Sequence, residues 1–580
     1  MNAPAPAARI LRGYGPLLAF ALLFCLMAAF VPTVGEKVRT VPAEAEPAGA
    51  SSPADYPTGG AEEGAGNEGS LASGGSTAGG VPRPSTPTGP ARASGGGSGA
   101  AAGPQGTTGG AGQPATGGGP AASIRPCPNR PGQVQGDPYS PPCLVFSGDN
   151  GGAIGRGVTG DKVRISVRLF DFPEFSIGPE DGPQTTFTFN KEELKNTVAG
   201  LAEYFNSRFQ FYGRKLEPAF FDGKGDILAE FQGAGQEEAE ADAVKAVEEI
   251  KPFAELFAIT TPYADALSRR QLVNVGAPVM SQQWHAARRP FAWTAGPDCT
   301  FVLEAISDYL LKRVVRRPAA FAGGDLKGKE RSLGLIVPDN PWYQECADAG
   351  EKTLRAAGAP PRLRLAYKLD INTLSNQAAS MVAKLRDAGV TTVVCGCDPA
   401  LPVFLTSKAQ EQAYEPEWVV AGTAFTDTDG AGQLYQQDQW SRAFGLSFLG
   451  SPQPERGSYG YFAFKAVRPD QEPIALVDIL YYQMYVIALG VQMAGPGLTP
   501  ETFEAGLYAY PGGTGPAGTW RFTPGRYSPT QDGREIYWDR NRTSGRNNKK
   551  GGYVETEPGK RYRPGDWPAS DPAVFRGSTD

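Results

Sequence analysis

The chain has 580 residues, a formal net charge of −6, 7 cysteines and 1 histidine. Its charges are spread without the basic face that nucleic-acid binding requires, so no nucleic-acid partner is expected. The part of the chain that can fold exceeds the size of one ordinary hydrophobic core, which indicates two lobes.

An uncharged apolar run covers residues 17–34 and follows Arg9 and Arg12. Positive residues before such a run favour a cytoplasmic N-terminus, here residues 1–16. The length of the run lies between a signal-peptide core and a minimal membrane-spanning helix. Two outcomes are therefore open: an uncleaved transmembrane anchor or a cleaved export signal. In both, everything after Glu36 lies outside the cytoplasm, either anchored to the cell membrane or secreted.

Residues 35–126 are rich in Gly, Ala, Ser and Pro and contain few large apolar side chains. Such a segment cannot bury enough surface to offset its ordering entropy, so we expect a disordered linker. A Cys-bounded lead-in follows over residues 127–157. Cys127 and Cys143 flank its Pro-rich loop and are expected to form a disulfide, which suits an oxidising compartment.

The first lobe is predicted over residues 158–320. Strand-like runs alternate with helix-like runs in this stretch, which is typical of a parallel α/β sheet. The predicted strands are 158–169, 216–221, 253–259 and 272–280, and the predicted helices are 191–211, 236–250, 264–270 and 299–315.

The second lobe is predicted over residues 321–450, after a Gly- and Lys-rich hinge at 322–329. Apolar runs at 333–337 and 390–394 each end in a break, around Asp339 and Asp398, and the run 418–421 ends at a Gly-Thr-Ala turn. Residues 451–510 read as a helical return to the first lobe, and 511–580 as a turn-rich C-terminal segment. The expected fold is α/β, with two Rossmann-like lobes joined by a hinge, and ligands bind at the carboxyl ends of such strands.

Four further cysteines, Cys299, Cys346, Cys395 and Cys397, leave their pairing open. Strand alternation would point the sulfurs of Cys395 and Cys397 to opposite faces, so each could pair with a different partner. A metal centre is the weaker alternative, because neither a CxxC spacing nor a second histidine supports it.

Three stretches resemble one known family in the same order. They are GVTGDKVRISV at 157–167, LGLIVPDNPWYQECADAGEKTLRAAGA at 333–359 and DILYYQMYVIALGVQMAGPGLTPETFEAGL at 478–507. They resemble type I periplasmic (extracellular solute-) binding proteins, in the branch of ABC-transporter substrate-binding proteins that includes branched-chain amino-acid binders. The resemblance covers roughly residues 157–510.

The resemblance implies a ligand held between the lobes by the loops that follow the strands. Phe170 and Asp171 come at the end of the first strand and are added from the residue pattern. The positions carried over from the family are Thr260, Thr261 and Tyr263; Ser281, Gln282, Trp284 and His285; Asp339, Trp342 and Tyr343; Asp398; and Thr423 with Phe425.

The chain departs from the family pattern at these loops. The family often has Gly-Pro-x-x-Ser after the third strand, where this chain has Thr261, Pro262 and Tyr263. Bulky Trp284 and His285 replace small residues after the fourth strand. These departures argue against a plain branched-chain amino acid as the ligand.

The sequence therefore predicts a non-catalytic, extracellular solute-binding protein. Its ligand would be small and polar or amphipathic (amino-acid-, amide- or peptide-like), and its protein partner an ABC importer permease. The alternative is a membrane-tethered ligand receptor or surface interaction protein with the same fold. No cofactor, metal or catalytic group is expected, and the membrane is contacted only through the N-terminal segment.

Overall fold

The computed structural model describes residues 122–170, 175–177, 185–187, 190–277, 279–474 and 477–570. The predicted membrane segment 17–34, nearly all of the linker 35–126 and the candidate ligand residue Asp171 lie outside these ranges. The described residues fall within one compact unit.

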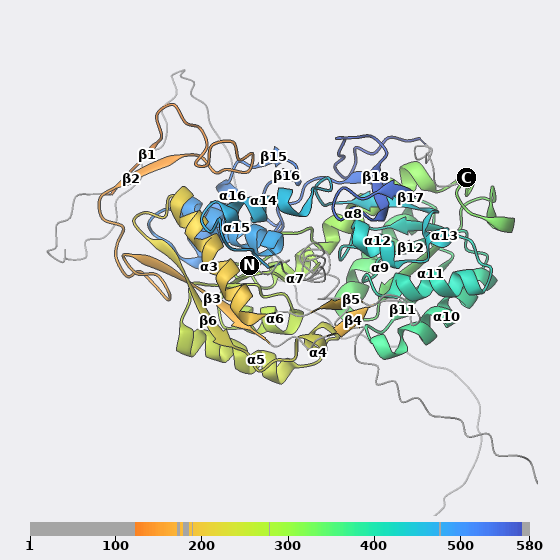
Figure 1. The fold of residues 1–580 in the computed structure, drawn as a ribbon, viewed down its shortest axis with the longest axis horizontal. Coiled ribbons are helices and arrows are strands. Elements are labelled where there is room, and N and C mark those ends of the chain that lie inside the picture. Colours follow the sequence, from red (N-terminus) through yellow and green to blue (C-terminus); the bar gives the residue numbers. More distant parts are fainter. Residues whose placement is uncertain are drawn as a thin grey trace, which may run out of the picture. The chain divides into compact units, whose positions relative to one another are not determined.

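The first lobe is built on a five-stranded parallel sheet with the strand order β6-β3-β7-β8-β9, of which β3 and β6 are labelled in Figure 1. Central strand β3 (Lys162–Leu169) is buried on both faces, because Val163, Ile165 and Val167 alternate with buried Ser166 and Arg168. This confirms the predicted parallel α/β arrangement. The other strands are β6 (Lys215–Asp222), β7 (Ala254–Leu256), β8 (Val273–Val275) and β9 (Ala292–Trp293).

Helices cover both faces of the first sheet. One face carries α3 (Lys191–Arg208) and the returning α14 (Tyr459–Lys465), α15 (Val477–Ala494) and α16 (Pro500–Ala509). The other carries α5 (Gln236–Lys245), with a π-helical turn at Ala246–Ile250, and α6 (Thr261–Arg269). Short helices α4 (Ile227–Phe231) and α7 (Gln282–Ala286) and the hairpin β4 (Phe175–Ile177) and β5 (Thr185–Phe187) lie in the strand–helix connections.

The second lobe has a seven-stranded sheet with the order β11-β10-β12-β13-β14-β17-β18. Its first five strands are parallel: β10 (Leu333–Pro338), β11 (Leu363–Tyr367), β12 (Thr392–Cys395), β13 (Glu417–Val420) and β14 (Ala443–Ser447). The last two, β17 (Arg534–Thr543) and β18 (Lys550–Glu555), are antiparallel. The C-terminal segment therefore completes this sheet, which its turn-rich sequence did not indicate.

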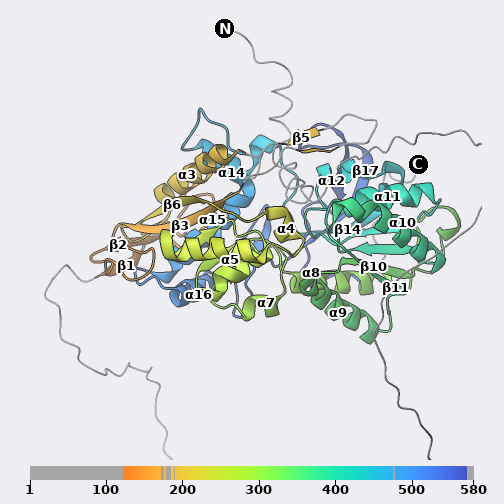
Figure 2. The ribbon, with the colours of Figure 1, turned by 90° about the horizontal axis from the view of Figure 1, so that it is seen from below.

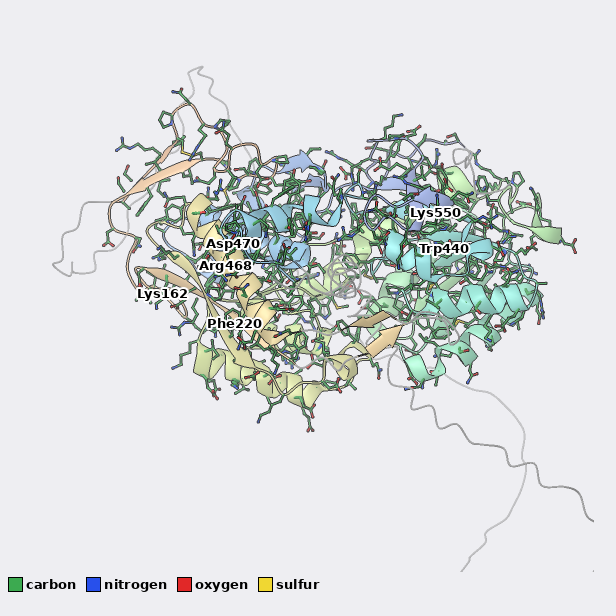
Figure 3. The ribbon with its side chains drawn as sticks, viewed as in Figure 1. Lys162, Phe220, Trp440, Arg468, Asp470 and Lys550 are labelled. Atoms are coloured by element: carbon green, nitrogen blue, oxygen red, sulfur yellow. A yellow bond between two sulfur atoms is a disulfide. The ribbon has the colours of Figure 1, made fainter. Side chains whose placement is uncertain are left out.

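Two helix layers enclose the second sheet (Figure 2). On one face, α8 (Cys299–Tyr309), its π-helical end Leu310–Val314 and α9 (Pro341–Ala356) pack on Leu335, Val394 and Phe444. On the other lie α10 (Ile371–Asp387), α11 (Leu401–Glu411), α12 (Asp429–Leu434) and α13 (Gln437–Trp440). Trp440, labelled in Figure 3, is buried here against Tyr435, with ring centroids 4.5 Å apart.

The boundary between the lobes differs from the expected position near residue 320. Helix α8 shares its core with the second sheet, since Phe301, Val302 and Ile306 pack with Leu333 and Leu354. The chain therefore passes between the lobes at residues 294–298, upstream of the predicted hinge at 322–329. It returns at 448–458 and passes a third time at 521–533, before β17.

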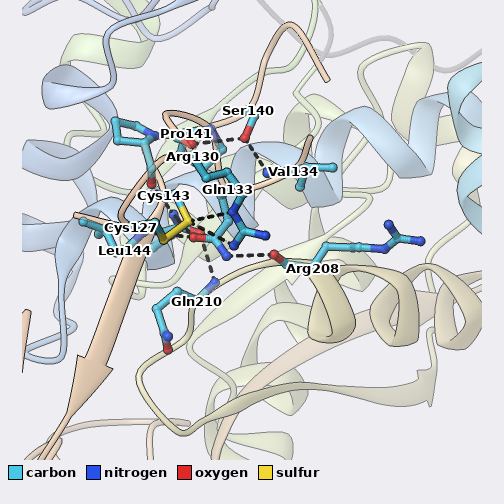
Figure 4. Close-up of a disulfide and its surroundings, with 12 residues drawn as sticks. Cys127, Arg130, Gln133, Val134, Ser140, Pro141, Cys143, Leu144, Arg208 and Gln210 are labelled. Carbon is cyan, nitrogen blue, oxygen red and sulfur yellow. Dashed lines mark hydrogen bonds between the residues drawn. A yellow bond between two sulfur atoms is a disulfide. The ribbon is translucent and has the colours of Figure 1, made fainter. Parts of the chain in front are cut away.

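The Cys-bounded lead-in packs on the first lobe, after the ribbon of β1 (Ser123–Pro126) and β2 (Leu144–Ser147). A disulfide joins Cys127 to Cys143, as expected from their positions around the loop. Figure 4 shows Gln133 of this loop, which donates from Nε2 to the carbonyl oxygen of Arg208 at 3.0 Å. The loop also contacts the hairpin of β15 (Gly513–Gly515) and β16 (Gly518–Trp520) through Tyr139.

Two more disulfides lie in the second lobe. Cys299 of α8 is bonded to Cys346 of α9, and Cys395 is bonded to Cys397. The expectation that the sulfurs of Cys395 and Cys397 point to opposite faces is wrong. Strand β12 ends at Cys395, so strand alternation does not extend through Gly396 to Cys397.

Helix α15 is the one helix among the described residues that is long and apolar enough to cross a membrane. Most of it is buried against α16, α3 and β7. Its apolar composition is therefore explained by its place in the core of the first lobe.

Candidate functional site

Two cavities lie where loops after the second-lobe strands meet residues of the first lobe. The larger, here called the hinge cavity, has a volume of about 540 Å³. All three segments that connect the lobes contribute to its wall. The lining residues are Ala295–Pro297, Pro399, Phe425, Asp427–Asp429, Ala431, 448–453, 457–459, Phe462, Asp478, Ile479, Tyr482, Pro516, Ala517, Trp520, Thr530, Arg534 and Arg546.

Aromatic side chains form much of the wall of the hinge cavity. Tyr482 and Trp520 lie with ring centroids 5.2 Å apart, and Phe462 is 59% exposed, which is unusual for a large apolar side chain. Phe425 and Phe448 contribute from the second lobe. Such a wall can stack on planar, apolar or cationic groups.

Asp427 is the most distinctive polar group of this cavity. Its side chain is buried, with 4% of the residue exposed, and neither carboxylate oxygen has a hydrogen-bond partner among the described residues. Ser447 and Arg534 are polar neighbours, but neither makes a well-formed bond to it. Burial raises the pKa of Asp427 above its usual range. A carboxylate in this state can accept hydrogen bonds from a bound solute.

Asp478 and Arg546 are two further charged residues of the hinge-cavity wall. The Asp478 carboxylate of α15 accepts a hydrogen bond from the Gly460 N–H at 3.0 Å, and burial raises its pKa. The positive charge of Arg546, in the loop between β17 and β18, opposes this rise in the pKa of Asp478. The Nε of Arg546 lacks a hydrogen-bond partner among the described residues. Asp429, in contrast, is satisfied by the Tyr553 N–H and the Ser544 hydroxyl.

The second cavity, here called the apolar cavity, has a volume of about 110 Å³ and lies between α8, α9 and the second sheet. Three predicted ligand residues, Tyr343, Asp398 and Thr423, line it. The remaining lining residues are Val279, Cys299, Val302, Leu303, Ile306, Ser307, Leu310, Leu335–Pro338, Cys346, Ala347, Gly350, Glu351, Leu354, Leu369, Val394, Gly396, Cys397, Ala421 and Ala424.

Backbone strain marks the border between the two cavities. Ala424 and Phe425 have φ values of 48° and 63°, and Val279 has a φ of 47°. Left-handed backbone is costly for residues with a side chain, above all for β-branched valine. Strain of this kind concentrates at binding sites, and here Ala424 faces the apolar cavity while Phe425 faces the hinge cavity.

The predicted residues after the third strand face inward. Thr260 is fully buried and its hydroxyl donates to the Glu230 carboxylate, which also forms a two-bond ion pair with Arg168. Tyr263 is equally buried, with its ring centroid 3.8 Å from the Arg168 guanidinium carbon. The Thr261 hydroxyl points to the Met280 sulfur at 3.5 Å. None of the three lines either cavity.

Glu255 completes this buried network from β7. It accepts hydrogen bonds from the Ser166 hydroxyl and from the Arg168 N–H, the latter at 2.9 Å. Burial raises the pKa of Glu255 to about 7, in spite of these donors and the nearby Arg168 charge.

The predicted residues after the fourth strand also have internal partners. Ser281 caps α7 by accepting from the Trp284 N–H at 2.9 Å, and the Gln282 N–H donates to the Thr300 hydroxyl at 3.0 Å. Trp284 packs under the Arg288 guanidinium. His285 is fully buried with Nδ1 at 3.1 Å from the Ala292 carbonyl oxygen, and burial lowers its pKa to about 4.

The remaining predicted ligand residues differ in their exposure and in their contacts. Phe170 is buried and stacks on Phe257, and the Asp339 side chain is exposed. Trp342 and Tyr343 pack against the apolar cluster of the first lobe. Asp398 lines the apolar cavity, yet its carboxylate already accepts from the Ala400 N–H and the Tyr367 hydroxyl.

The structure thus brings together Tyr343, Asp398 and Thr423 at one cavity and places Phe425 at the other. It adds Trp520, Arg534 and Arg546, which come from the segment 511–580. Only the excess of aromatic residues there, in a stretch otherwise typical of turns, hinted at a packed role.

Comparison with known proteins places the chain among periplasmic binding proteins. A family model described as "Periplasmic binding protein" matches residues 177–543. No curated protein matches the chain by sequence.

Several solved structures resemble the chain at low sequence identity. One is the solute-binding protein of an ABC transporter from Rhodopseudomonas palustris BisB5, in complex with 3,4-dihydroxybenzoic acid (11% identity, TM-score 0.48, covering 70% of this chain and 98% of that chain). Another is the branched-chain amino acid transporter substrate-binding protein LivJ from Streptococcus pneumoniae, in complex with isoleucine (13%, 0.45, 68% and 100%). A third is a fatty acid ABC transporter substrate-binding protein from Thermomonospora curvata (13%, 0.48, 73% and 99%).

Proposed function

The chain belongs to the periplasmic binding protein family, and we propose that it captures a small polar or amphipathic solute outside the cell and delivers it to an ABC importer. The hinge cavity is the proposed site of capture. The observation that carries this proposal is the composition of its wall, which includes residues of all three connecting segments.

A solute in such a position can couple binding to lobe orientation. Rotation of one lobe against the other changes the backbone conformation of the connecting segments, and in the proposed site these segments contact the solute directly. The solute therefore has different contacts in different orientations, which is the requirement for a ligand to shift a conformational equilibrium. An importer that recognises one orientation would then recognise the loaded protein.

The polar groups of the cavity favour a solute with hydrogen-bond donors. Asp427 lines the cavity with a buried side chain whose oxygens lack partners, so a solute that reaches them can donate hydrogen bonds, and the aromatic wall accommodates an apolar or planar part. An amino-acid-, amide- or peptide-like solute meets both requirements. A volume of about 540 Å³ lies within the usual range for small-molecule sites.

A thermal-shift screen over amino acids, amides, short peptides and polyols tests the proposal. A solute at 100 times its Kd should stabilise the chain by about 2.7 kcal/mol, a clear rise in Tm. Asp427→Asn should weaken the response to a solute with a cationic nitrogen, and Asp438→Asn, on the exposed face of α13, serves as the matched control. A folded sample that no solute stabilises would contradict the proposal.

We further propose that the folded domain is held at the outer face of the cell membrane by residues 17–34, or is secreted if this segment is cleaved. The anchor and the long linker also motivate the alternative of a tethered receptor that binds the same solute without transport. Mass determination of the mature N-terminus separates an anchored form from a released one. A cleaved, freely released protein would exclude tethering through this segment.

A further inference from the structure

We propose that the apolar cavity of the second lobe binds the unbranched aliphatic part of an amphipathic solute. The inference rests on the proposed function, because it assigns this cavity to the captured solute. The inference goes beyond the proposed function because it defines a second subsite, which binds an apolar group.

The position of the cavity permits such a use. Its residues at the carboxyl ends of the strands, Pro338, Asp398 and Ala424, lie near Val279 of the first lobe. From this mouth the lining continues along the sheet, under α8 and α9, to Leu310 and Leu354. The aliphatic chain of a solute that enters at the lobe boundary would therefore extend into the second lobe.

The chemistry of the wall excludes a polar occupant from the deeper part. Val302, Leu303, Ile306, Leu335 and Val394 present only hydrocarbon. Among the described residues, no buried polar side-chain atom that lacks a partner belongs to this lining. A buried water needs two to four polar partners, and apolar cavities of this kind stay dry and take up apolar molecules.

Away from the mouth, Ser307 and Glu351 are the polar side chains of the lining, and Glu351 is paired with Arg355 and Arg364. The polar side chains at the mouth also have internal partners. Asp398 accepts from the Ala400 and Leu401 N–H groups and from the Tyr367 hydroxyl. The Thr423 hydroxyl donates to the Cys397 carbonyl oxygen at 3.4 Å. A polar headgroup can thus lie beside the mouth, although no unpaired buried charge at the mouth requires one.

The walls are covalently fixed on two sides. The disulfide between Cys299 and Cys346 joins α8 to α9, with their Cα atoms 6.2 Å apart. The disulfide between Cys395 and Cys397 fixes the end of β12. Cys299, Cys346 and Cys397 all line the cavity, so these bonds oppose its collapse.

A series of unbranched alkan-1-ols, from ethanol to octan-1-ol, tests the inference by calorimetric titration of the full chain. Each added methylene should tighten binding about fourfold until the cavity is filled, after which the affinity should level off. Ala347→Leu fills the cavity from α9 and should abolish the dependence on chain length. Val302→Leu fills the cavity from α8 and is a second, independent variant in case Ala347→Leu folds poorly. Ala349→Leu, on the exposed face of α9, is the matched control and should leave the series unchanged.

The outcomes separate this inference from the proposed function. A solute that binds while alcohols show no chain-length dependence overturns the inference and leaves the function intact. Alcohol binding that Ala347→Leu and Val302→Leu do not affect also overturns it. Length-dependent alcohol binding without any solute from the screen supports the cavity and contradicts the proposed function. Mutual competition between the alcohols and the solute is the expected result.

Discussion

At the scale of single residues, the main surprise is that several predicted ligand residues of the first lobe are buried. Thr260 and Tyr263 follow a strand end, as the family pattern requires, but they pack on Arg168. The partners of Arg168 are 62 and 74 residues away, at Glu230 and Asp242. Sequence spacing carries no information on such a distant charge network, so the residues appeared free to bind a ligand.

The buried network predicts a specific pH dependence. Burial raises the pKa of Glu255 to about 7 from its usual value of 4.5. The folded state therefore holds a proton that the unfolded state releases, so this stabilisation is full below pH 4.5 and is lost as the pH rises to 7. Glu255→Gln should be more stable than the wild type at pH 8, by on the order of 1–3 kcal/mol, and nearly equal at pH 4.5.

Urea unfolding at both pH values, followed by tryptophan fluorescence, measures this difference. Glu217→Gln, at a partly exposed ion pair, is the control and should change stability by no more than about 1 kcal/mol. An equal effect of Glu255→Gln at both pH values would show that Glu255 is not protonated in the folded state.

The strained turn at Ala424 gives a second prediction. Glycine adopts a φ of 48° without a Cβ penalty, so Ala424→Gly should raise the free energy of unfolding by about 0.5–1 kcal/mol. Ala349→Gly, on the exposed face of helix α9, should lower it by about 1 kcal/mol. Chemical denaturation of the two variants checks the sign, and a loss of stability in both would argue against strain at Ala424.

At the scale of elements, the apolar runs indicated strands β3, β6, β7, β8, β10, β12 and β13, whereas β9, β11 and β14 were not predicted. Apolar runs bounded by Gly and Pro identify central strands such as β3 and β12, which are buried on both faces, whereas β11 is partly exposed and β9 has only two residues. Helix α8 was also predicted, but its lobe was not, since an amphipathic helix does not specify which sheet it covers. Strands β17 and β18 were missed because Arg534, Asp539 and Arg540 interrupt the apolar pattern.

The hairpin β15–β16 shows how one element positions another. The Tyr139 hydroxyl accepts from the Ala517 N–H at 2.8 Å and donates to the Gly518 carbonyl oxygen at 2.9 Å. A Cβ at Gly513 would overlap the Pro138 carbonyl oxygen, so glycine is required for this close packing. The Cys-bounded lead-in thereby holds Trp520, which lines the hinge cavity.

Tyr139→Phe should therefore affect both stability and binding. Loss of the two hydrogen bonds leaves buried backbone groups unsatisfied, which costs about 1–3 kcal/mol in the free energy of unfolding. We also expect weaker solute binding, because Trp520 loses its support. Tyr204→Phe, which removes a hydroxyl without a hydrogen-bond partner among the described residues, is the control for both measurements. Unchanged solute affinity in Tyr139→Phe would separate the lead-in from the cavity.

At the scale of the whole molecule, the three segments that connect the lobes meet at the hinge cavity. The sequence predicted two lobes, a hinge and a ligand between them, and three of its candidates meet at the apolar cavity. The hinge cavity could not be predicted from the sequence, because residues 295–297, 448–459 and 516–534 come together only when the chain passes between the lobes three times.

Capture without conversion at the hinge cavity is most directly tested by calorimetric titration of the solute found in the screen, followed by mass spectrometry of the recovered solute. We predict one solute per chain, recovered chemically unchanged, and a loss of affinity of at least tenfold in Trp520→Ala, since stacking aromatic anchors contribute 1.4 kcal/mol or more, roughly a factor of ten. A solute that is returned altered, or that binds Trp520→Ala as tightly as the wild type, would contradict the account.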